Sequence, residues 1–358
     1  MGFSEWAKAQ EEYQASVDAG GGIPALRKLA QAQMQRRDMK EVEKTIDALT
    51  REGAREEDLL LLKVIVALRT GEVVQATQLL AAATDSPQKN YGTALLAVIQ
   101  GDNKEARAAL DRVVAGWEPT LRAYARALQA AYQEFETFPQ SRPIHLSTLL
   151  ARSLAQVQEC ELALPLLAQV IREQDDYRDA WIVQGYCELT TERDKEALAS
   201  FERAYTIDPE KPEVQYFLGR TYMVLKDTKK ALTFFQYALE NGFEPRGEVR
   251  ARLAYAALEE GNTSLALEQY EELARGENAT PDIAEKLVTL SITLDKKDEA
   301  YAAASAAAGR WPDDAVMHGL LGWAAQELGR KDEAKAELEK ALHIDPTLQS
   351  ARERLGRL

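Results

Sequence analysis

An alanine recurs along most of this chain at a nearly constant spacing. The members of this alanine column lie 34 or 35 residues apart: Ala163, Ala197, Ala231, Ala266, Ala300 and Ala334. A fixed period of this length indicates one supersecondary unit that is repeated and stacked, because a single unit cannot bury its own apolar face. Such a stack usually acts by presenting surface to other molecules. The period therefore predicts the architecture far better than it predicts the biochemistry.

Two further columns keep the same register. Four residues after each alanine lies a column of mostly bulky residues: Leu167, Phe201, Phe235, Tyr270, Ala304 and Leu338. Twelve residues before each alanine lies a column of mostly small ones: Ala151, Gly185, Gly219, Ala254, Val288 and Gly322. Small residues at fixed places let two helices approach closely, and the larger ones fill the space beside them. The columns therefore predict a helix hairpin in every unit.

These columns resemble the tetratricopeptide repeat (TPR), whose pattern is W-x2-L-G-x2-Y, then A-x3-F, then P. The unit that begins at Arg178 supplies Trp181, Gly185, Ala197, Phe201, Ala204 and Pro209. The next unit supplies Leu218, Gly219, Tyr222, Ala231, Phe235 and Ala238. The resemblance implies an all-α, right-handed α-solenoid of about nine helix hairpins. In each hairpin a helix A precedes a helix B, and the A helices line a concave groove.

The N-terminal part follows the pattern less closely. Val42, Ala76 and Ala106 continue the alanine column with spacings of 34 and 30 residues, which indicates three degenerate repeats. The longer gap before Ala163 requires one additional helix. We expect a leading helix at 1–19, degenerate repeats at 20–118, and an extra helix with a proline-containing linker at 119–143. A regular array follows at 144–348, and 349–358 form a capping helix or the start of a truncated repeat.

Composition restricts the partners and the compartment. The formal net charge is −14, which disfavours nucleic acid as a partner because phosphate backbones are repelled. No segment reaches the roughly 18 apolar residues that a membrane-spanning helix needs, so no direct membrane insertion is expected. The start of the chain is not a basic region followed by an apolar one, so no signal peptide is predicted. We expect a cytoplasmic protein, or a periplasmic or membrane-associated one if an N-terminal anchor has been removed.

Residues that carry catalytic or metal chemistry are sparse and scattered. The three histidines lie in distant repeats without metal-ligand spacing, and no phosphate-binding glycine loop or nucleophile elbow is present. The sequence therefore predicts a non-enzyme without cofactor or metal. The resemblance implies that Cys160 and Cys187 occupy places that can face each other across a repeat interface. A disulfide between them is conceivable, but two buried free thiols are the preferred interpretation.

The resemblance places ligands along the A helices, at positions three before, one after and four after the small column. The candidate protein- or peptide-binding residues are Ile182, Tyr186, Tyr216, Arg220, Met223, Tyr255 and Trp323. Tyr, Trp and Arg are enriched at binding hot spots, and Met adapts to varied partners. This face would suit an extended or helical peptide with apolar anchors and one acidic group for Arg220. The alternative is that these side chains pack on one another or on a neighbouring helix.

The N-terminal repeats offer a second apolar surface at Leu61, Ile65, Leu68, Tyr91 and Leu95. The segment 59–68 is apolar nearly all round, which is typical of a helix buried on every side. It could be covered by the leading helix, by the extra helix 119–136, by a second copy in a homo-oligomer, or by a partner helix. An intrachain helix is favoured, because connections between neighbouring elements are short.

The sequence thus predicts a non-enzymatic adaptor or scaffold that binds a protein or peptide segment in the concave groove. The alternative is a TPR subunit of an envelope assembly, such as a pilus, secretion or outer-membrane complex, whose N-terminal anchor is absent from this sequence.

Overall fold

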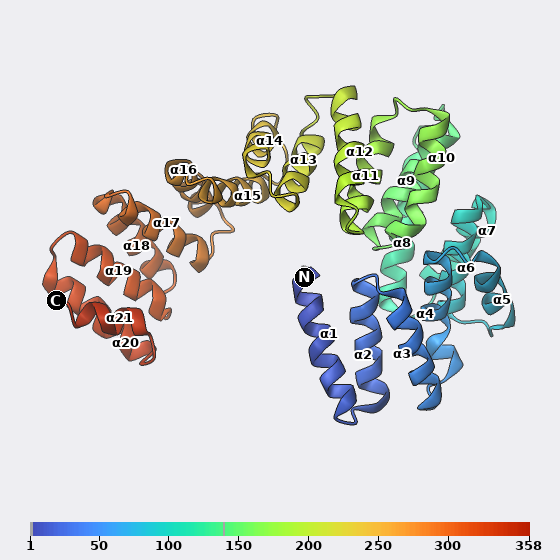
Figure 1. Ribbon diagram of the computed structural model, residues 1–358, viewed down its shortest axis with the longest axis horizontal. Coiled ribbons are helices and arrows are strands. Elements are labelled where there is room, and N and C mark those ends of the chain that lie inside the picture. Colours follow the sequence, from blue (N-terminus) through green and yellow to red (C-terminus); the bar gives the residue numbers. More distant parts are fainter. Residues whose placement is uncertain (1–2, 139) are drawn as a thin grey trace. The chain divides into compact units, whose positions relative to one another are not determined.

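The computed structural model describes residues 3–138 and 140–358, and within them every regular element is a helix (Figure 1). The predicted all-α class is therefore confirmed for the described residues. The chain divides into two compact units, unit 1 at Met1–Ile207 and unit 2 at Asp208–Leu358. Residues 1 and 2 of the predicted leading helix and Pro139 of the predicted linker lie outside the described residues.

Unit 1 contains five helix hairpins and two additional helices. The hairpins are α2 (Gly22–Gln35) with α3 (Met39–Arg51), α4 (Glu56–Arg69) with α5 (Val73–Ala82), α6 (Pro87–Gln100) with α7 (Asn103–Ala115), α9 (Pro143–Gln156) with α10 (Cys160–Glu173), and α11 (Arg178–Thr190) with α12 (Asp194–Ile207). The additional helices are α1 (Phe3–Asp18), which packs on α2, and α8 (Pro119–Glu136), which packs on α7 and α9.

Unit 2 contains four hairpins and a short final helix. The hairpins are α13 (Pro212–Val224) with α14 (Thr228–Glu240), α15 (Arg246–Glu259) with α16 (Thr263–Arg275), α17 (Pro281–Thr293) with α18 (Lys297–Arg310), and α19 (Ala315–Glu327) with α20 (Lys331–Ile344). The final helix α21 (Gln349–Leu355) packs against α19 and α20. The nine hairpins of the two units agree with the predicted number of repeats.

One backbone conformation marks the turn inside every hairpin. The residue five positions before the alanine column has a positive φ of 56–83° in all nine hairpins: Arg37, Gly71, Gly101, Gln158, Glu192, Lys226, Gly261, Asp295 and Gly329. The next residue closes a six-residue Schellman turn, as when the Asp227 N–H donates to the carbonyl of Tyr222 at 2.9 Å. The Asp227 carboxylate then accepts from the Lys230 N–H and caps the second helix. Asp227 thus closes the turn that ends α13 and also caps the start of α14.

In the interior of each hairpin, the residue of the small column packs against the residue of the bulky column. The alanine column is fully buried in both units, and so are Val42, Ala76 and Ala106 in the degenerate repeats. A Cβ added to Gly219 would lie 2.6 Å from the ring of Phe235, and one added to Gly185 would lie 2.7 Å from Phe201. The missing Cβ therefore makes room for the ring. Hairpin α17–α18 reverses the sizes, with Val288 in the small column and Ala304 in the bulky column, both fully buried.

No helix in the described residues is both long and apolar enough to cross a membrane.

Candidate binding face on helices α13 and α15

A hydrogen-bonded group joins the first helices of two successive hairpins in unit 2. The Tyr216 hydroxyl on α13 donates to the Glu248 carboxylate on α15 and accepts from Arg252 Nε at 2.7 Å. Burial raises the pKa of Tyr216 to about 12, and the hydrogen bond to Glu248 adds to this effect. Burial alone would raise the pKa of Glu248, but hydrogen bonds from Tyr216 and Arg252 outweigh it and lower that pKa below its ordinary value. The group therefore keeps an ionised carboxylate paired with a guanidinium.

Tyr216 itself is not available to a ligand. Only 2 % of this residue is exposed, because its ring stacks on Phe243 with a centroid separation of 4.3 Å and also contacts Phe217. Phe243 comes from the segment between α14 and α15. The structure thus corrects the expectation that Tyr216 presents its ring to a partner. Its hydroxyl contacts Glu248 and Arg252 instead.

Three of the predicted residues remain accessible around this group. Arg220 lies one helical turn beyond Tyr216, with its guanidinium 5.8 Å from the Tyr216 ring centroid and 5.7 Å from that of Phe217. Among the described residues it forms no ion pair. Met223 follows on the same side of α13 and is partly exposed. Tyr255, which lies on α15 one turn after Arg252, is 54 % exposed. We call Arg220, Met223 and Tyr255 the α13–α15 face.

Trp323 does not belong to this face. Its indole N–H donates to Glu327 at 3.1 Å, and the Arg354 guanidinium of α21 lies 3.7 Å from its ring centroid. Burial lowers the pKa of Arg354. The end of the chain therefore covers the aromatic side chain that the sequence analysis assigned to ligand binding.

Ile182 and Tyr186 lie on α11 and belong to unit 1. Tyr186 packs partly buried against the core of that unit, and Ile182 is partly buried. These two residues are therefore not part of the α13–α15 face of unit 2.

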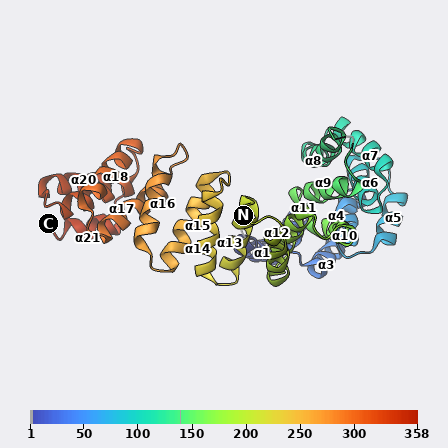
Figure 2. The same ribbon diagram turned by 90° about the horizontal axis from the view of Figure 1, so that it is seen from above.

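The second apolar surface of the sequence analysis is core. Leu68, Tyr91 and Leu95 are at most 5 % exposed, and Leu61 and Ile65 pack partly buried against the same core. The helix α10 packs against both α4 and α6 (Figure 2). The covering element is thus a helix of the same chain, as favoured. Over α4 this helix is α10 of the later array, whereas at α6 the extra helix α8 also contributes, with the Tyr124 ring centroid 6.1 Å from that of Tyr91.

A cluster of ion pairs fastens this contact, and the sequence analysis missed it. Arg69 Nε, at the end of α4, lies 2.8 Å from a Glu159 oxygen, and Arg37 lies 2.9 Å from a Glu161 oxygen. Both guanidinium groups also donate to the backbone carbonyl of Gln158, at 3.1 and 2.9 Å. Burial raises the pKa of Glu159, although the charge of Arg69 opposes the shift. We call these five residues the arginine clamp.

The two cysteines are buried as free thiols and lie close together in unit 1. Burial raises the pKa of Cys187, and a hydrogen bond with Cys160 raises it further. A protonated, inaccessible thiol is a poor nucleophile. Across residues 3–138 and 140–358, no three His, Cys, Asp or Glu side chains gather where they could hold a metal ion.

This burial has a measurable consequence for thiol chemistry. Native protein is expected to react with Ellman's reagent far more slowly than the same protein in guanidinium chloride, where both thiols become exposed. A Ser305→Cys variant, altered at an exposed position of α18, supplies the control for a reactive surface thiol. Labelling of native wild-type protein as fast as that of the variant would show that the two cysteines are accessible.

Comparison with known proteins identifies a known repeat in part of the chain. Three family models described as tetratricopeptide repeat match residues 148–212, 192–246 and 315–348. A peroxisomal targeting signal receptor of Candida albicans is 23 % identical over 257 residues, which cover 67 % of this chain and 43 % of that protein. This chain therefore spans less than half of the length of that relative.

Solved structures of repeat proteins also resemble the chain. YrrB, described as a TPR protein with an unusual peptide-binding site, is 20 % identical with a TM-score of 0.46, covering 54 % of this chain and 98 % of that one. PilF of Pseudomonas aeruginosa is 18 % identical with a TM-score of 0.43, covering 60 % of this chain and 97 % of that one.

Proposed function

Because this chain carries tetratricopeptide repeats at residues 148–246 and 315–348, we propose that it is a non-enzymatic adaptor or scaffold that binds a protein or peptide segment. The relative from Candida albicans is named as a receptor for a targeting signal, which supports a polypeptide as the ligand. Within unit 2 the α13–α15 face is the proposed site.

The observation that carries this proposal is the environment of Arg220. Its charge lies over the rings of Tyr216 and Phe217, while Arg252 is already engaged by Glu248 at 3.2 Å. A guanidinium held on aromatic rings, near the charge of Glu248 but without an ion pair to it, is a ready donor for an acidic group. Tyr255 and Met223 offer apolar contacts beside it. The preferred ligand is therefore a peptide segment with one acidic side chain and apolar neighbours.

Tyr255→Ala together with Met223→Ala is expected to weaken capture of the cellular partner on the order of tenfold, because the two contacts contribute about 1–2 kcal/mol at a hot spot. The partner is identified by a photo-crosslinking amino acid at position 255, and affinity is then measured with the purified partner. The matched control is Tyr237→Ala on α14, where the tyrosine is 41 % exposed. Equal losses for the two tyrosines, or none, would exclude the α13–α15 face.

A further inference from the structure

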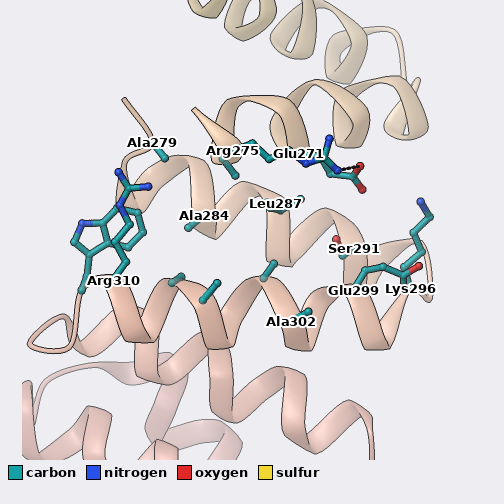
Figure 3. A pocket seen from close by; sticks show the side chains of 15 residues that line it. Glu271, Arg275, Ala279, Ala284, Leu287, Ser291, Lys296, Glu299, Ala302 and Arg310 are labelled. Carbon is teal, nitrogen blue, oxygen red and sulfur yellow. Dashed lines mark ion pairs between the residues drawn. The ribbon is translucent and has the colours of Figure 1, made fainter. Parts of the chain in front are cut away.

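A groove lies between the second helices of two successive hairpins in unit 2. It has a volume of 650 Å³ and is bounded by α16 and α18, with α17 as its floor (Figure 3). A volume of this size is within the range of ordinary ligand sites. The α13–α15 face lies on the first helices of its hairpins, so this groove is a separate site.

Alanine side chains create the space. The α18 wall presents Ala302, Ala303, Ala306 and Ala307, and the floor and opposite wall add Ala284 and Ala274. Between Glu299 and Arg310, which lie at its two ends, α18 contributes only alanines to the lining of the groove. A stretch of alanines alone would be only a closely packed surface, so the inference depends on the polar groups described next.

One polar group in the floor lacks a partner. Ser291 on α17 is fully buried and lines the groove, yet its hydroxyl forms no hydrogen bond among the described residues. An unpaired buried hydroxyl is destabilising, and native proteins contain few of them. Neighbouring side chains cover this hydroxyl, and once an occupant of the groove displaces them it can donate to a carbonyl oxygen. A helix uses its carbonyls internally, whereas an extended peptide presents free ones.

The charged residues that line the groove favour a negatively charged occupant. Arg310 lies at one end with its guanidinium 5.1 Å from the Trp311 ring centroid, and Lys296 lies with Glu299 at the other end (Figure 3). Lys296 forms no ion pair among the described residues. Arg275 is the third cation, and it pairs with Glu271 at 3.9 Å and more closely with Glu272, which does not line the groove. Three cations against two carboxylates give this lining a net positive charge, although the whole chain carries −14.

We propose that this groove binds an extended, apolar peptide segment that carries an acidic side chain. From Glu299 to Arg310 the α18 wall is about 16 Å long, at 1.5 Å per residue. That length accommodates roughly five extended residues. Apolar side chains pack on the alanines, a backbone carbonyl accepts from Ser291, and the acidic side chain pairs with Arg310 beside Trp311.

The test uses fluorescein-labelled, amidated hexapeptides composed of Ala, Val and Leu with one Asp, Asn or Lys near the end. Fluorescence polarisation at low salt is expected to show Asp peptides binding at least tenfold more tightly than Lys peptides. Arg310→Glu should reverse that preference. Ala306→Leu fills the groove and should weaken binding at least tenfold, whereas Ser305→Leu, exposed on the same helix outside the lining, should leave it unchanged.

Ser291→Ala separates a ligand-binding role from a structural one. Removal of the unpaired hydroxyl is expected to raise the melting temperature of the free protein and to lower the peptide affinity severalfold. A structural role would move both quantities in the same direction. Higher stability with unchanged affinity would overturn the hydrogen bond from Ser291.

Three other outcomes would overturn the site. The first is that none of the hexapeptides binds. The second is a loss of binding in Tyr255→Ala, which would place the peptide on the α13–α15 face and leave the proposed function intact. The third is dimerisation of the wild type that Ala306→Leu abolishes in sedimentation, because the occupant would then be a second copy of the chain.

Discussion

Exchange of Glu159 for alanine is expected to lower the free energy of unfolding of unit 1 by about 3–5 kcal/mol. Glu159 and its partner Arg69 have side chains that are 6 % and 5 % exposed. Without the Glu159 carboxylate, the buried Arg69 loses its close ion pair and keeps only a longer one with Glu161 at 3.8 Å and its hydrogen bonds to backbone carbonyls. Urea unfolding, monitored by amide hydrogen exchange in α4 and α10, measures the free energy of unfolding of unit 1, because both helices belong to that unit.

Two controls define the result. Glu56→Ala removes the pair with Lys63, in which the carboxylate side chain is 70 % exposed, and should cost under about 1 kcal/mol. Arg69→Met combined with Glu159→Met should recover much of the loss, because apolar replacement of a whole buried pair is often nearly neutral. Similar small costs for Glu159→Ala and Glu56→Ala would contradict the arginine clamp.

Gly219→Val and Phe235→Ala are each expected to destabilise unit 2 strongly, but not additively. The valine would force its Cβ to within 2.6 Å of the Phe235 ring, an overpacking that costs about 1–3 kcal/mol. Removal of the ring leaves a cavity that costs about 3–5 kcal/mol. Thermal or urea unfolding of the single variants and the double variant completes the cycle.

The double variant should be more stable than the sum of the single losses by about 1–3 kcal/mol. The reason is that it copies Val288 and Ala304, which fill hairpin α17–α18 of the same chain. Gly309→Ala is the control for a helical glycine with nothing within 4 Å of an added Cβ, and it should stabilise by roughly 0.5–1 kcal/mol. Strict additivity would show that the two columns do not share one space.

The sequence was sufficient to predict the hairpins because their determinants are local and periodic. Helix pairs, the buried alanine column and the turn glycines Gly71, Gly101, Gly261 and Gly329 all follow from one register. The same register also places Lys226 and Glu192 at positive φ, but these residue types do not reveal that conformation by themselves. Their position relative to the alanine column is the signal that could have identified it.

The candidate site was predicted less well, because side-chain exposure depends on contacts that no repeat pattern encodes. Tyr216 has the spacing of an exposed ring, but Phe243 between two helices covers it. Trp323 is covered by Arg354 of α21. The arginine clamp joins Arg69 to Glu159 across 90 positions. Contacts that are distant in sequence must be seen in three dimensions.

The shared turn conformation has a consequence for how such a chain can diversify. In each hairpin the turn conformation sets how the two helices meet, and the small and bulky columns fill the space between them. Neither the turn nor this packing depends on the residues that face outward. A substitution on an outward face leaves the geometry of its hairpin intact and would alter only the surface proposed for binding. The outward surface can therefore change by single substitutions, while the scaffold beneath it stays constant.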